Sequence, residues 1–159
     1  MKIQLICFDL GGVLIRIADN WTDASALAGL SVGIDPRSPL VHEYLTATAN
    51  GIMTGQLDMQ SFVGQIAKRA GLLPHQVMQA SAAWLCGPFP GVGMLIESVA
   101  ASEVQTACLS NTNDHHWQLM TTNDNSNFLP LDRFDHRFAS HLIGYAKPAS
   151  GIYAHVEEA

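Results

Sequence analysis

The sequence has 159 residues, of which 48% are hydrophobic and 14% are charged, and 14 acidic against 8 basic residues give a formal net charge of −6. This composition is typical of a folded globular protein and excludes an intrinsically disordered chain. The three lysines, Lys2, Lys68 and Lys147, are scattered along the chain. Without a basic run to follow a phosphate backbone, we expect no nucleic-acid partner.

Cysteine usage and hydropathy indicate a reduced compartment and no membrane partner. The cysteines are Cys7, Cys86 and Cys108, an odd number without metal-ligand spacing, which is typical of reduced thiols in a cytoplasmic protein. Asp9 interrupts the apolar N-terminal run, and no stretch approaches the ~20 apolar residues that span a bilayer. We therefore expect a cytoplasmic protein with neither a signal peptide nor a membrane segment.

Three short apolar runs predict buried β-strands. Residues 3–8 form the first and end at Asp9, residues 104–109 form the second and end at Ser110, and residues 137–143 form the third. Each run is followed by small or turn-forming residues, as expected where a buried strand gives way to a loop.

Helical patterns lie between and after these strands. Apolar residues at helical spacing predict helices over 59–70, from Pro74 through Leu85, over 91–101 and over 149–158, and the polar stretch 121–127 predicts a surface loop. Strands that alternate with helices indicate an α/β protein with a parallel sheet. The helical block between Ile15 and Pro90 is too long for a simple crossover, and it predicts an inserted helical cap.

Polar residues follow each predicted strand at the sheet edge where open α/β proteins bind ligands. Asp9 is a competent phosphoryl acceptor, and the amides of Gly11 and Gly12 can approach an anion closely. Ser110 and Asn111 can donate hydrogen bonds to phosphoryl oxygens, whereas Lys147 can balance negative charge. Taken singly, each also fits a turn, a helix cap or a solvated surface residue.

Three motifs carry a resemblance to a known family. The segments FDLGGVL at 8–14, LSNTN at 109–113 and GYAKP at 144–148, the last followed by Ile152 and Tyr153, resemble the first three motifs of the haloacid dehalogenase (HAD) superfamily. Residues 55–62 are similar to a recurrent segment of the family's cap. The combination resembles the branch that contains a glucose-1-phosphate phosphatase.

The resemblance implies a Rossmann-like core formed by residues 1–15 and 89–159, with a helical cap at residues 16–88. It also implies a phosphatase acting on a small phosphorylated metabolite, with sugar phosphates among the candidates. Asp9 would be the nucleophile and form an aspartyl-phosphate, Ser110 would bind phosphate and Lys147 would balance charge. Mg²⁺ would be held by the Asp9 carboxylate and the backbone carbonyl of Gly11.

Two departures from the family pattern affect these expectations. Family phosphatases usually carry an acid two residues after the nucleophile, where this sequence has Gly11, and acid–base help of this kind is typically worth ~10²–10⁴-fold. The family's fourth motif is an acidic pair after the next strand, but the printed sequence ends at residues 155–159, within the preceding helix. We therefore expect weak Mg²⁺ affinity and an exposed sheet edge, which a homodimer is one way to cover.

Two alternatives remain open. The chain can be an impaired or truncated family member that binds a phosphorylated ligand or a protein partner. It can also be a 2-haloacid dehalogenase that uses Asp9 on carbon without Mg²⁺. The adjacent His115 and His116 point in different directions on a helix, so we expect no histidine metal site. The tryptophans are expected to serve packing.

Overall fold

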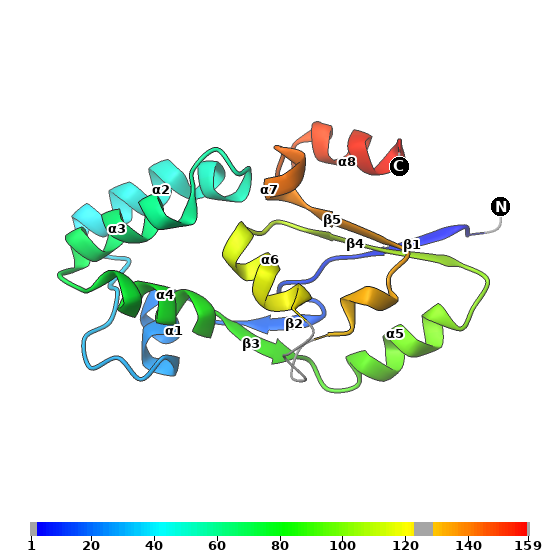
Figure 1. The fold of residues 1–159 in the computed structure, drawn as a ribbon, viewed down its shortest axis with the longest axis horizontal. Helices are drawn as coiled ribbons and strands as arrows, with labels where there is room; N and C mark the ends of the chain where they lie inside the picture. The colour runs from blue at the N-terminus through cyan, green and yellow to red at the C-terminus, as the bar shows by residue number, and fades with distance from the viewer. Residues whose placement is uncertain (1–2, 123–128, 159) are drawn as a thin grey trace.

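The structure is a computed structural model, and it describes residues 3–122 and 129–158. Its main sheet has three parallel strands in the order β1-β4-β5, namely β1 (Leu5–Phe8), β4 (Gln105–Ser110) and β5 (His136–Ala139) (Figure 1). Parallel registers pair Phe8 with Cys108 and Ser110 with Ala139, so the carboxyl ends of the strands lie together. The predicted α/β class with a parallel sheet is confirmed.

The third predicted strand, 137–143, is too long. The strand β5 ends at Ala139, and the next residues form the short helix α7 (Ser140–Ile143). The Ser140 hydroxyl donates a 2.6 Å hydrogen bond to the carbonyl of Met53, and the Ser140 carbonyl accepts from the Gly144 N–H at 2.9 Å. These bonds turn the backbone into a helical turn where apolar composition alone predicts a strand.

A second sheet of two antiparallel strands was not predicted. It pairs β2 (Ile15–Ile17) with β3 (Leu85–Pro88). The Arg16 side chain donates to the carbonyl of Cys86 at 2.8 Å, which ties the two strands together. The helix expected from Pro74 through Leu85 is therefore shorter than predicted, and Leu85 belongs to a strand. Runs of three or four residues carry too little periodicity to distinguish a strand from a helix.

Helices cover both faces of the main sheet, which gives three layers (Figure 1). The covering elements are α5 (Val92–Ala100), α6 (Asp114–Thr121), a short 3₁₀ helix η1 (Leu131–Arg133) and α8 (Ser150–Glu157). Alternate residues of β4 face the two layers, as a pleated strand requires. Cys108 packs with Ile96 of α5, whereas Ala107 and Leu109 pack with Ile152 of α8. Most of the predicted loop 121–127 lies outside the described residues.

Four helices lie to one side of the sheet and share a core of their own (Figure 1). They are α1 (Trp21–Leu27), α2 (Pro39–Met53), α3 (Met59–Ala70) and α4 (Pro74–Ala83). The helix predicted over 59–70 is confirmed as α3, and Gly71 ends it in the left-handed conformation at φ 67°. The division into a core and a cap at residues 16–88 stays a prediction. Within 3–122 and 129–158, every helix is too short or too polar to cross a lipid bilayer.

A glycine contact joins the four-helix part to the rest of the chain. Gly55 follows α2 with φ at +72°, and a Cβ atom there would lie 2.5 Å from the carbonyl oxygen of His141 in α7. Backbone therefore packs directly on backbone at this point, and any side chain would force the two segments apart.

We predict that Gly55→Ala destabilises the protein more than Gly71→Ala. Both glycines have positive φ, but a Cβ at Gly71 would meet nothing within 4 Å. Each substitution should lose about 1–2 kcal/mol for the left-handed backbone, and Gly55→Ala about 1–3 kcal/mol more for the clash. Urea unfolding of the two variants measures the difference directly. Equal losses would contradict a tight contact at Gly55.

Candidate active site

The three residues predicted at strand ends meet in one cavity. Asp9 follows β1, Ser110 is the last residue of β4, and Lys147 lies in the loop before α8. All three line a cavity of about 190 Å³ at the carboxyl edge of the sheet. Because parallel strands end at the same edge, residues that are far apart in sequence become neighbours here.

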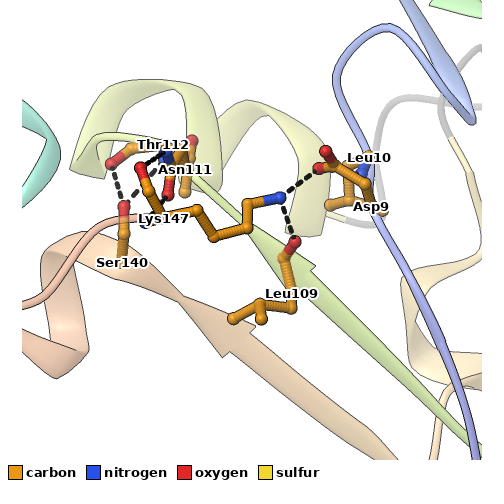
Figure 2. Close-up of polar contacts among 7 residues, drawn as sticks. All are labelled: Asp9, Leu10, Leu109, Asn111, Thr112, Ser140 and Lys147. Atoms are coloured by element: carbon orange, nitrogen blue, oxygen red, sulfur yellow. Dashed lines mark hydrogen bonds and ion pairs between the residues drawn. The ribbon is translucent and has the colours of Figure 1, made fainter. Parts of the chain in front are cut away.

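An ion pair forms the centre of this cavity. The Nζ atom of Lys147 lies 2.8 Å from Oδ1 of Asp9 and donates a 2.9 Å hydrogen bond to the carbonyl of Leu109. The same Oδ1 accepts the backbone N–H of Leu10 at 2.7 Å (Figure 2). Both of these donors engage one carboxylate oxygen. The other oxygen, Oδ2, takes part in neither bond.

The Asn111 side chain holds the lysine segment in place. Its Nδ2 donates to the Lys147 carbonyl at 2.9 Å, and its Oδ1 accepts from the Lys147 N–H at 2.7 Å (Figure 2). Two hydrogen bonds to one residue fix the backbone from which the lysine side chain extends. Asn111 therefore positions Lys147, and its expected contact with phosphate stays a prediction. Ser110 is buried, with 3% of its surface exposed, and it borders the cavity.

The glycine turn after Asp9 offers fewer free amides for binding an anion than the sequence suggests. The Gly12 N–H donates to the carbonyl of Ile15 at 2.8 Å, and Gly12 adopts φ at 77°. Its amide is thus committed to the turn, and phosphate binding by Gly12 stays a prediction. Gly11 lines the cavity, and a Cβ there would meet only the Ile17 side chain at 3.7 Å, an ordinary contact. There is therefore room for an acidic side chain at position 11.

The oxygen atoms around Asp9 are suitable ligands for a Mg²⁺ ion that is also coordinated by a substrate. Among the described residues that line the cavity, only Asp9 has a carboxylate, and Ser110 and Thr112 also offer oxygens. No group of three or more histidine, cysteine or acidic side chains that could hold a metal occurs within the described ranges. Mg²⁺ is commonly bound by one or two carboxylates together with substrate phosphate and water. The Asp9 carboxylate and the Gly11 carbonyl would fit such a shared site.

Sequence reasoning missed two residues that also line this cavity, Trp84 and His116. The Nε2 atom of His116 lies 2.8 Å from the carbonyl of Ser81, to which it can only donate. Burial lowers the pKa of His116 from 6.5 to about 4, so the ring is neutral near pH 7. A sequence signal for His116 was available. It lies three residues after the helix-capping Asn113, in the first helical turn after β4. The histidine links α6 to α4.

No protein-family model matches the chain, and no curated protein matches it. Solved structures do match. A HAD family enzyme from Bacteroides thetaiotaomicron, BT-2542, is 23% identical with a TM-score of 0.82, over 99% of this chain and 78% of that one. A predicted HAD-like family hydrolase from Porphyromonas gingivalis is 24% identical with a TM-score of 0.76, over 98% of this chain and 75% of that one. L-2-haloacid dehalogenase from Xanthobacter autotrophicus is 19% identical with a TM-score of 0.59, over 99% and 64%.

The chain therefore has the fold of the HAD enzymes, and the resemblance drawn from its three motifs is confirmed at this level. The narrower resemblance to the glucose-1-phosphate phosphatase branch stays a prediction.

We predict that His116 makes stability depend on pH. Its pKa is lower in the folded state than in the unfolded state, so acid protonates the unfolded chain first. The free energy of unfolding should be fully retained above pH 6.5 and fall by about 2–3 kcal/mol as the pH approaches 4.

Urea unfolding at pH 7 and pH 4.5, with His116→Gln as the comparison, tests this. The variant should lose much less stability in acid. Burial also lowers the pKa of His115 and His141, but both remain in the variant and cancel in the comparison. An unchanged pH dependence in the variant would refute the assignment to His116.

Proposed function

We propose that the protein is a phosphatase that hydrolyses monoesters of small metabolites through an aspartyl-phosphate on Asp9. The observation that carries this proposal is the ion pair of Asp9 and Lys147, which shares a cavity with Ser110. A nucleophilic carboxylate beside a fixed cation is suited to an anionic phosphoryl group, which a carboxylate alone would repel. Support also comes from BT-2542, whose structure has been solved in complex with magnesium and inorganic phosphate.

The chemistry proceeds in two displacements at phosphorus. The substrate phosphoryl group binds between Lys147 and Ser110, and Oδ2 of Asp9 attacks it. The new Asp9–phosphorus bond forms as the ester bond breaks, and the departing alcohol oxygen takes a proton from water. Water then attacks the aspartyl-phosphate, which releases inorganic phosphate and restores the carboxylate. A bound Mg²⁺ at Asp9 and the Gly11 carbonyl would supply further charge neutralisation.

Among the described residues that line the cavity, none is an evident proton donor for the leaving group. Gly11 has no side chain, and the Nε2 proton of His116 is already donated to Ser81. With water as the proton source, we expect the rate to depend strongly on how readily the alcohol leaves.

Asp9→Asn tests the proposed function. Phosphate release should be measured from p-nitrophenyl phosphate and from alkyl phosphates, with and without Mg²⁺. We expect Mg²⁺-dependent release by the parent protein and a loss of at least ~10³-fold in the variant, because the nucleophile is gone. No release from a folded parent protein would defeat the phosphatase proposal. Mg²⁺-independent halide release from 2-chloropropionate would favour a dehalogenase instead.

Gly11→Asp should restore the missing acid. The position can take a side chain, and an acid there should raise the rate on alkyl phosphates by at least ~10-fold while changing that on p-nitrophenyl phosphate much less. Gly11→Asn is the matched control, because it has the same shape but no proton to give. Equal effects of the two substitutions would show that shape, rather than proton transfer, is responsible.

A further inference from the structure

A second cavity lies between the four helices α1–α4 and the start of α6. Its volume is about 280 Å³, close to the lower end of small-molecule sites. Most of its wall is aromatic or aliphatic, with Trp21, Leu45, Ile52, Met59, Phe62 and Trp84 among the lining residues. Among the residues that the structure describes, no acidic side chain, lysine or arginine lines it.

The two cavities share a wall. Trp84 and His116 line both the apolar cavity and the cavity that contains Asp9. A ligand with its phosphate at Asp9 therefore has this apolar space directly beside it.

The few polar groups of the apolar cavity are already engaged. His116 Nε2 lies 2.8 Å from the Ser81 carbonyl, and Asn113 Oδ1 accepts the His116 N–H at 2.9 Å as the cap of α6. A hydroxyl-rich group placed here would lose its bonds to water and find few replacements.

The aromatic wall favours a compact ring. Trp21 and Trp84 have ring centroids 5.2 Å apart, and Trp21 and Phe62 6.1 Å apart, both in tilted arrangements. Tilted aromatic rings of this kind offer large apolar surfaces, and burial of a ligand's apolar surface against them drives binding.

We infer that the substrate is a phosphate monoester whose organic part is apolar and compact, and that this part occupies the cavity lined by Trp21 and Trp84. The inference rests on the proposed phosphatase function and specifies its substrate class. It also argues against the sugar phosphates considered from sequence.

A matched pair of substrates tests the inference. Cyclohexylmethyl phosphate and glucose 6-phosphate are both esters of primary alcohols on six-membered rings, and they differ mainly in the ring oxygen and hydroxyl groups. We expect kcat/KM to be at least ~10-fold higher for the cyclohexyl ester, since one buried apolar ring provides that much discrimination. Equal or better hydrolysis of glucose 6-phosphate would overturn the inference and leave the phosphatase function standing.

Binding can be measured without catalysis. Trp117 lies outside the lining of either cavity, so a Trp117→Phe background leaves Trp21 and Trp84 as the fluorescent reporters. Cyclohexylmethanol should change their emission in a saturable way, whereas glucose should not. Such a change without hydrolysis of any ester would support the apolar site and defeat the phosphatase proposal. No change with the alcohol would count against the site.

A substitution at the rim of the apolar cavity tests where the organic part of the substrate binds. Ala49 is exposed on α2 and lines the cavity, while Ala47 is exposed on the same helix and does not. Ala49→Phe should raise KM for cyclohexylmethyl phosphate by about 10-fold, because the ring occupies ligand space. Ala47→Phe is the control. Inhibition by inorganic phosphate should be unchanged in both, and an unchanged KM in Ala49→Phe would refute the proposed location.

Discussion

The contact between Lys147 Nζ and Asp9 Oδ1 depends on nearly every feature of the core. Parallel pairing brings the ends of β1 and β4 together, and the Leu109 carbonyl and the Asn111 amide fix the lysine from both ends. Asp9 follows a strand whose residues alternate between exposed and half-buried, and its carboxylate pairs with the lysine at 2.8 Å. The same arrangement keeps a cation where a phosphoryl group would need one. Lys147 therefore pairs with Asp9 and is also the cation that phosphoryl chemistry would require.

The sequence alone was sufficient to predict the strands that end at Asp9 and Ser110. In both cases a polar residue closes an apolar run, which is a local signal. The burial predicted for the first run was wrong, because Leu5 and Cys7 of β1 are exposed, whereas all residues of β4 after Gln105 are buried. The helix α3 was predictable for a similar reason, since its apolar residues keep one face and Gly71 ends it. Parallel topology then determined which residues would meet, so the convergence of Asp9, Ser110 and Lys147 followed from order along the chain.

Features that depend on distant partners escaped prediction. The turn at Ser140 is formed by a hydrogen bond to Met53, 87 residues earlier in the chain, and His116 is held by Ser81 across 35 residues. Neither partner is visible in the local sequence. The Asn111 amide illustrates the same limit within a correctly located site, because its residue type suits phosphate binding but its bonds go to Lys147. Local patterns identify which residues gather, whereas long-range contacts decide what each one does.

Gly55 has a consequence for how this fold can diverge. The chain keeps a TM-score of 0.82 to an enzyme with which it shares 23% of residues, so most side chains in such a fold can be exchanged as neighbours adjust. At Gly55 the neighbour is the backbone carbonyl of His141, which cannot become smaller. We expect this glycine to be inherited unchanged through long evolutionary drift, while the exposed Ala49 at the rim of the apolar cavity varies freely. Substitutions at the rim would then leave the contact between Gly55 and His141 undisturbed.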